Sequence, residues 1–169
     1  MDSLDVGLRM VHRTPKTNAM RALEARHVPY ETLTYSPEIH SADVVAETLG
    51  LPASQVYKTL VVLRERGRPM LAMVAGDREL DPRALAREIG EKRVAMAPKK
   101  EAERLTGLQV GGIGALALLN RGFDVYVDRR ALEHERILVN GGQRGLNLRL
   151  RVSDLIAVTG AKVVDATGE

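Results

Sequence analysis

The sequence contains no cysteine and no tryptophan, and it has a single phenylalanine among 169 residues. Without cysteine, disulfide bonds, thiolate zinc sites and cysteine nucleophiles are excluded. With so few aromatic side chains, the core has to be aliphatic. No stretch approaches the roughly 18 apolar residues that a membrane helix needs, and the first residues lack the apolar run of an export signal. We therefore expect a cytoplasmic protein with no membrane anchor.

What the sequence does contain is ordinary for a globular protein. Hydrophobic residues make up 44% and charged residues 28% of the chain. The 25 lysines and arginines exceed the 22 acidic residues by three, which is compatible with a nucleic-acid partner without requiring one. The length corresponds to about one domain. We expect a leader over residues 1–13 and a single domain over residues 14–169.

Helix and strand signals mix along the chain without strict alternation. Helices are predicted to begin at Thr14, Ser41, Asp81, Pro98 and Ser153. Strands are predicted over residues 30–35, 56–63, 69–75, 93–96, 123–127, 137–139, 146–150 and 162–164. In the second helix, Val44, Val45 and Leu49 are expected to face inward. Several neighbouring strands are close enough to form hairpins, which favours an α+β fold with a mixed sheet over a doubly wound parallel sheet.

Lys58 is the most informative residue. In the strand over residues 56–63, alternation places Lys58 on the same face as Val56 and Leu60, and the opposite face is also apolar. Burying an ammonium group is costly, so a lysine in such a strand is unusual. Either Lys58 binds an anion or polarises a carbonyl at the wall of a pocket, or it reaches solvent from the end of the strand.

Two glycine-rich segments are further candidates. Around Gly111, Gly112 and Gly114, backbone amides can approach a ligand closely; the alternative is a turn between sheet elements. Residues 112–117 formally match a dinucleotide fingerprint of an oxidoreductase, but no βαβ unit is evident. Residues 141–145 indicate either a hairpin turn or part of a pocket mouth.

The remaining polar candidates are weaker. Lys99 and Lys100 fall in the first turn of a helix, as an anion site or as a solvated pair. His40 precedes a helix and is a candidate pocket residue, whereas Asp77 and Glu79 are expected to be solvated. No metal motif and no nucleophile elbow is present. An enzyme of this kind would act through binding, dipoles and a water molecule, without a metal or an organic cofactor.

Three blocks in order resemble the YbaK/EbsC family, free-standing relatives of the prolyl-tRNA synthetase editing domain. They are residues 50–60 with Val56-Tyr57-Lys58-Thr59-Leu60 at the end, residues 106–113, and residues 141–146. The resemblance runs from about Thr14 to Asp165. It implies a mixed-sheet, barrel-like α+β fold with flanking helices. It also implies hydrolysis of mischarged aminoacyl-tRNA, above all tRNA for proline carrying Cys or Ala, with the tRNA 3′ end as ligand and prolyl-tRNA synthetase as a partner.

The resemblance also assigns roles to residues. Lys58 matches the lysine that the family needs for activity, and Thr59 follows it as in the family. Tyr35 matches a pocket tyrosine, and Gly111 and Gly112 match the loop whose amides hold the aminoacyl carbonyl. The other expected substrate-binding residues are Ile113, Gly114, Asn140, Gly141, Gly142 and Asn147.

The chain departs from the family pattern in the same region. Gly114 and Ala115 stand where the family loop commonly has Ser and Pro, so the fixed φ of proline is lost. Asn140 and Asn147 stand where relatives often have Ser and Asp, and Asn147 therefore removes a negative charge near the expected substrate amine. Ser41 stands near the sequence position where a relative has an aromatic pocket residue. The lost proline and the missing acidic residue favour the alternative of a non-catalytic module that binds an aminoacyl group, a nucleotide or a tRNA end, whereas the retained Lys58 argues against it.

Overall fold

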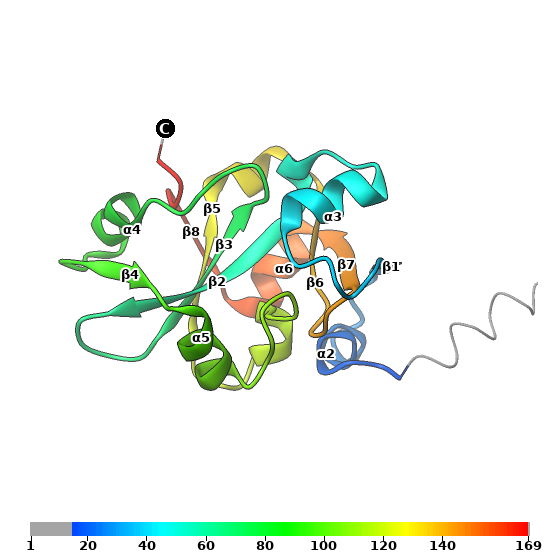
Figure 1. Cartoon of the computed structure of the whole chain (residues 1–169), viewed down its shortest axis with the longest axis horizontal. Coiled ribbons are helices and arrows are strands. Elements are labelled where there is room, and N and C mark those ends of the chain that lie inside the picture. Colours follow the sequence, from blue (N-terminus) through cyan, green and yellow to red (C-terminus); the bar gives the residue numbers. More distant parts are fainter. Residues whose placement is uncertain (1–14, 169) are drawn as a thin grey trace, which may run out of the picture.

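The computed structural model describes residues 15–168, so the expected leader over residues 1–13 and the expected helix start at Thr14 lie outside the described part (Figure 1). The helices are α2 (Asn18–Ala25), α3 (Ala42–Leu49), α4 (Pro82–Ile89), α5 (Lys99–Thr106) and α6 (Val152–Thr159). The strands are β1 (Glu31–Thr34), β2 (Tyr57–Arg64), β3 (Met70–Ala75), β4 (Val94–Met96), β5 (Asp124–Asp128), β6 (Arg136–Asn140), β7 (Leu146–Arg151) and β8 (Lys162–Val164). Short 3-10 helices are η1 (Ala53–Gln55), η2 (Ala115–Leu118) and η3 (Arg129–Glu133). None of these described helices has the length and apolar character to span a membrane.

The strands form two sheets, which confirms the α+β class with mixed pairing. One sheet has the order β4-β2-β3-β5-β8, with antiparallel pairing at β4-β2-β3 and parallel pairing from β3 to β5 and from β5 to β8. The other is the antiparallel sheet β1-β7-β6. An isolated bridge between Val56 and Leu138 joins them. The sheets do not close into a barrel, which corrects the barrel-like arrangement that the family resemblance implied.

β4 covers only part of the edge of β2. It pairs with β2 at Val62, Leu63 and Arg64 and ends at Met96. The amide of the next residue, Ala97, still donates to the carbonyl of Val61. Beyond that point β4 gives β2 no partner, although β3 continues to pair with β2 on the other edge as far as Tyr57.

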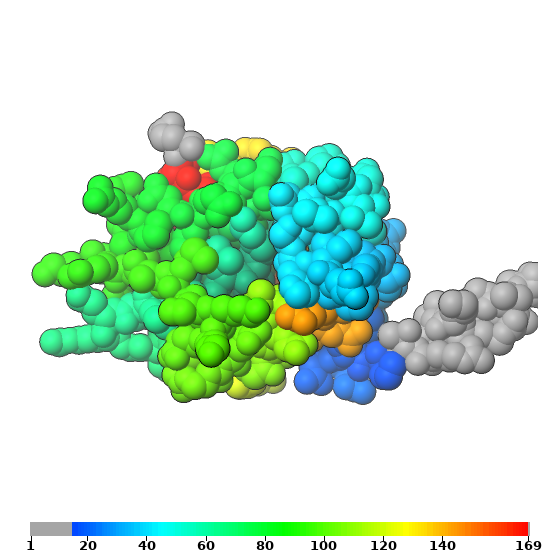
Figure 2. Space-filling view, viewed as in Figure 1, coloured from blue at the N-terminus to red at the C-terminus, as the bar shows by residue number. Residues whose placement is uncertain are grey.

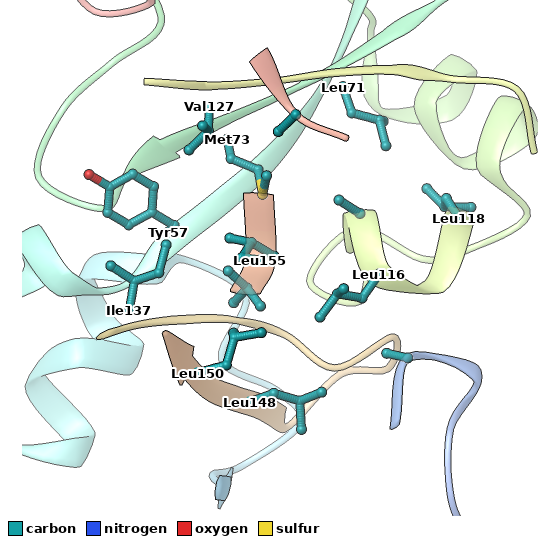
Figure 3. Packing of buried hydrophobic residues seen from close by; sticks show 14 of the residues in the cluster. Tyr57, Leu71, Met73, Leu116, Leu118, Val127, Ile137, Leu148, Leu150 and Leu155 are labelled. Carbon is teal, nitrogen blue, oxygen red and sulfur yellow. The ribbon is translucent and has the colours of Figure 1, made fainter. Parts of the chain in front are cut away.

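The core is aliphatic, as the composition requires. Its largest cluster lies between the two sheets, and a second cluster with Met70, Val74 and Leu85 covers the other face of the larger sheet. Figure 3 shows Leu71 and Met73 of β3 facing Leu148 and Leu150 of β7, with Leu155 of α6 between them. All five side chains are fully buried or nearly so. Each such side chain stabilises the fold by roughly 1.5–3 kcal/mol relative to an exposed position. This packing holds β3 in place, and β3 in turn fixes the neighbouring strand β2 through their antiparallel pairing.

The helix ends differ in detail from the predictions. Thr17, rather than Thr14, caps α2 by accepting a hydrogen bond from a backbone amide of the first turn. Ser41 occupies the cap position of α3, but its hydroxyl donates to the Asp43 carboxylate instead of serving the backbone. Ser153 is not a cap, because α6 already begins one residue earlier. Val44 is 41% exposed and not inward, since α3 turns the following two residues toward the core.

Candidate active site

A cleft of about 460 Å³ opens between α3 and α5, with β2 as its floor. In Figure 2 the cyan surface around α3 faces the green surface around α5, and the teal of β2 lies deeper between them. The structure brings most of the expected site residues to this cleft: Tyr35, Lys58, Thr59, Gly111, Ile113, Asn140 and Asn147. Gly112, Gly114, Gly141 and Gly142 do not line it.

Lys58 lies on the cleft floor in a half-buried position. β2 fixes its backbone through the antiparallel pairing of Lys58 with Val74, and its side chain is 25% exposed. The ammonium nitrogen lies 3.6 Å from Oε2 of Glu79, whose own side chain is 89% exposed. Glu79 is therefore solvated, as predicted, but it also stands over the lysine at the cleft wall, which was not predicted. A pair this exposed contributes at most about 1 kcal/mol.

The glycine loop forms a tight turn beside the cleft. The amide of Gly112 donates to the carbonyl of Gln109, and Gly111 has a φ of 92°, which a residue with a side chain rarely adopts. The ring of His40 covers this turn so closely that a Cβ on Gly111 would lie 3.1 Å from it. The Gly112 amide is thus occupied within the turn, whereas the amides of Gly111 and Ile113 donate to no other described residue.

The dinucleotide interpretation of residues 112–117 does not fit this geometry. The segment follows a turn rather than a strand, and it leads into η2, a 3-10 helix of four residues. The fingerprint needs a strand before the glycines and a full helix after them. A nicotinamide or flavin dinucleotide site is therefore not supported here.

Asn140 connects the glycine turn to the end of β6. Its side-chain amide donates to the carbonyl of Gly111 at 2.8 Å and to that of Gln143 at 3.3 Å. Its carbonyl oxygen accepts from the amide of Gly142 at 2.6 Å. The amide of Gly141 donates to Leu146 across the β6–β7 connection. Residues 141–145 are therefore a hairpin turn, held by Asn140, rather than a wall of the cleft.

Tyr35 and Asn147 form a hydrogen-bonded polar pair in the cleft. The Tyr35 hydroxyl donates to Oδ1 of Asn147 at 3.2 Å, and Asn147 is only 4% exposed. Burial raises the pKa of the Tyr35 phenol, so it stays protonated and remains a donor at neutral pH. The Asn147 side chain is thus engaged by a neighbour and carries no charge.

Two buried hydroxyl groups have no hydrogen-bond partner in the described part of the chain, those of Thr59 and Tyr57. Thr59 lines the cleft next to Lys58, and its hydroxyl is a buried polar group there whose hydrogen bond is not supplied by the described residues. Tyr57 points into the apolar core, where burial, assisted by the charge of Asp128, raises the pKa of its phenol. The family resemblance implied a role for Thr59 but none for Tyr57.

Four further side chains on the cleft wall were weak or absent predictions: His40, Asp43, Glu79 and Lys99. A hydrogen bond from Ser41, with a smaller contribution from Lys58, holds the pKa of the Asp43 carboxyl below its usual value. Asp43 carries a sequence signal only as an acidic residue in a first helical turn, and Glu79 carries none, because only the tertiary fold brings its loop to the cleft. Within residues 15–168, no three histidine or acidic side chains gather closely enough to hold a metal ion.

Residues 36–158 match the aminoacyl-tRNA editing domain family. EbsC of Enterococcus faecalis, named provisionally as a Cys-tRNA(Pro)/Cys-tRNA(Cys) deacylase, is 33% identical over 154 residues, which cover 90% of this chain and 93% of EbsC. The crystal structure of the hypothetical protein APE2540 superposes with a TM-score of 0.81 at 27% identity, covering 89% of this chain and 99% of that one. A structure described provisionally as a trans-editing enzyme for prolyl-tRNA synthetase gives a TM-score of 0.76 at 28% identity, over 92% of this chain and 100% of that one.

A shorter similarity extends to a much larger enzyme. The proline–tRNA ligase of Thermodesulfovibrio yellowstonii is 39% identical over 80 residues, which are 47% of this chain but only 14% of the ligase. The matched segment is therefore only a small part of the ligase. The family match, the full-length similarity to EbsC and the shared fold agree with one another. The chain belongs to the aminoacyl-tRNA editing domain family, whose members are hydrolases of the aminoacyl-tRNA ester.

Proposed function

We propose that this chain removes a non-cognate amino acid, Cys or Ala, from tRNA(Pro) in trans. The observation that carries the proposal is the position of Lys58, held by β2 on the floor of a cleft that is also lined by Gly111 and Ile113, whose amides donate to no other described residue. A cation and free amides in a partly closed cleft are the groups that bind an ester carbonyl as it gains negative charge. A charged tRNA as substrate also agrees with the cytoplasmic location expected from the sequence.

The proposed reaction is hydrolysis by water. The water oxygen adds to the ester carbonyl carbon, and the carbonyl oxygen becomes an oxyanion that Lys58 and the loop amides stabilise. Donors of this kind contribute about 3–4 kcal/mol each to the transition state in other enzymes. The oxyanion then reforms the carbonyl, the bond to the ribose oxygen breaks, and a proton from water ends on that oxygen. The products are the free amino acid and the uncharged tRNA.

Two substrate groups are expected to assist. The neighbouring ribose hydroxyl of the terminal adenosine orients the water. With cysteine, the family resemblance implies that the thiol itself attacks the ester carbonyl, so that the bond to the ribose oxygen breaks, the thiol proton passes to that oxygen and the amino acid leaves as a cyclic thioester. Neither route requires a side-chain nucleophile, which agrees with a cleft where the Ser41 hydroxyl donates to the Asp43 carboxylate rather than to the neighbouring His40.

Selection of the tRNA is assigned to a partner. A single methylene in a pocket changes binding by only about 1–3 kcal/mol, and a free-standing domain of this size has little surface for reading a tRNA. The similarity to a segment of proline–tRNA ligases supports prolyl-tRNA synthetase as that partner. Its addition is expected to restrict hydrolysis to tRNA(Pro) without changing which amino acid is released.

A deacylation assay tests the proposal. The purified chain is mixed with tRNA(Pro) charged with Cys, Ala, Ser or Pro, beside Lys58→Ala and the control Lys100→Ala, which removes an exposed lysine outside the cleft. We expect release of Cys or Ala but not Pro, loss of at least about a hundredfold in Lys58→Ala, and wild-type rates in Lys100→Ala. Both variants should melt at the wild-type temperature.

A non-catalytic binding module is the alternative. The occupied Gly112 amide favours it, because that leaves one fewer donor for the carbonyl than the family resemblance implies. If no aminoacyl-tRNA is hydrolysed while the folded chain still binds charged tRNA, the binding module replaces the deacylase. Full turnover in Lys58→Ala would instead refute the role of the lysine.

A further inference from the structure

Two carboxylates stand beside Lys58 at the cleft wall, Asp43 at the start of α3 and Glu79 in the loop between β3 and α4. We call them the rim carboxylates. Glu79 lies 3.6 Å from the Lys58 ammonium. The elements that carry them touch, because a Cβ on Gly76 would lie 3.1 Å from the side chain of Ala42.

The rim carboxylates are the acidic side chains of the cleft wall. The other polar groups there are neutral, as in Tyr35, Thr59 and Asn147, or basic. Asn147 stands where relatives often have an aspartate, and here its side-chain oxygen accepts from Tyr35. The unpartnered Thr59 hydroxyl is a separate sign that the same cleft takes a polar ligand.

We propose that the rim carboxylates bind the α-ammonium group of the aminoacyl ester, and so require a substrate with a free amine. This inference rests on the proposed function. In an aminoacyl ester the α-nitrogen and the carbonyl oxygen are three bonds apart, within roughly 3 Å of each other. A carbonyl oxygen bound to Lys58 therefore brings the α-nitrogen to the neighbourhood of Glu79, which already lies 3.6 Å from the lysine.

The chemistry of the amine supports this placement. An α-ammonium group that enters the cleft loses water and needs an acceptor. Lys58 would repel it, and neutral amides compensate a charge less well than a carboxylate does. Asp43 is held by the Ser41 hydroxyl at 2.6 Å, whereas Glu79 is almost fully exposed, so no packing prevents it from leaving the lysine for the amine.

The experiment compares matched substrates and matched variants. For whichever of Cys-tRNA(Pro) and Ala-tRNA(Pro) the wild type hydrolyses, an α-hydroxyacyl-tRNA(Pro) with the same side chain is charged with a ribozyme. The test variant is Asp43→Asn with Glu79→Gln. The control is Glu47→Gln with Asp77→Asn, which removes the same two charges from α3 and the same loop but outside the cleft wall.

We expect the wild type to prefer the amino over the hydroxy substrate at least tenfold in kcat/KM. The test variant should lose about 10- to 100-fold on the amino substrate, the range for a hydrogen bond to a charged group, and stay within about twofold on the hydroxy substrate. The control should match the wild type on both. Circular dichroism melting verifies that both double variants fold.

Four outcomes overturn the inference. Equal losses on both substrates mean that the rim carboxylates only position Lys58. Unchanged rates in the test variant mean that the rim carboxylates have no role in the reaction. A wild type that hydrolyses the amino and hydroxy substrates equally well means that the amine is not recognised. A wild type that hydrolyses no aminoacyl-tRNA refutes the proposed function itself, and the inference with it.

Discussion

The side-chain amide of Asn140 donates to the carbonyl oxygen of Gly111 across 2.8 Å. This bond joins the end of β6 to a turn that is 29 residues away in the sequence, and the same side chain holds the hairpin turn through Gly142. The position of the loop amides beside the cleft therefore depends in part on this buried asparagine, together with the Glu103 and Arg144 side chains that hold Val110.

We expect Asn140→Ala to weaken both the fold and the reaction. The substitution leaves the carbonyl of Gly111 and the amide of Gly142 without a partner, so the free energy of unfolding should fall by about 1–3 kcal/mol. The kcat of deacylation should fall as well, because the turn beside Lys58 is no longer fixed. Urea unfolding and single-turnover deacylation measure the two effects. A variant with wild-type stability would show that the turn holds itself.

Gly114→Ala should be destabilising although Gly114 has an ordinary extended backbone. A Cβ there would lie 2.7 Å from the carbonyl oxygen of Asn140, and backbone cannot move aside cheaply. Overpacking of this kind costs about 1–3 kcal/mol. Gly90→Ala is the comparison, since it adds a Cβ in open space and its cost comes only from the φ of 75° that an alanine rarely adopts. If Gly114→Ala unfolds at the wild-type urea concentration, β6 and the loop are not in rigid contact.

Two tyrosine-to-phenylalanine changes should have opposite signs. Tyr57→Phe removes a buried hydroxyl that has no partner among the described residues, so it should raise the free energy of unfolding by about 1 kcal/mol. Tyr35→Phe removes the donor to Asn147 and should lower it by a similar amount, about 1 kcal/mol. Urea titration of both variants under identical conditions gives the comparison. Shifts of the same sign would contradict the assigned hydrogen-bonding states.

Adjacent lysines at the start of α5 should differ in their effect on tRNA binding. Lys99 lines the cleft and Lys100 does not, although both are exposed. Lys99→Ala should raise the Kd for charged tRNA and reduce the slope of log K against log salt by about one phosphate contact. Lys100→Ala should change both much less. Binding measured from low to moderate salt decides between them, and equal effects would mean that the cations act only through net charge.

Local patterns predicted most of the elements correctly. α4 has the expected Asp81 cap, Pro82 in its first turn and Gly90 at its end with a φ of 75°. β2 follows from its apolar run, and Lys58 stood out because it interrupts a strand that is apolar on both faces. Signals of this kind lie within a few residues of one another, so they survive without knowledge of the fold.

Features that depend on distant segments were not predictable in the same way. Nothing in the sequence around β3 and β5 indicates that they pair in parallel, with β8 added on the far side. Glu79 is an exposed acid in a loop, and its sequence surroundings would be the same whether that loop reached a cleft or bulk solvent. Ser153 was a reasonable cap from composition alone, but the packing of Val152 starts the helix earlier.

The early end of β4 explains why there is a cleft at all. Because β4 stops at Met96, the main chain of β2 near Lys58 has no β4 partner on that edge. The space left there is part of the cleft that the substrate would use. The site thus arises by leaving out part of a sheet rather than by adding a specialised loop. Lengthening β4 by a few residues that pair with Thr59 would then fill this part of the cleft with main chain. Such a chain would keep the side chains that line the cleft and a complete core while excluding its ligand.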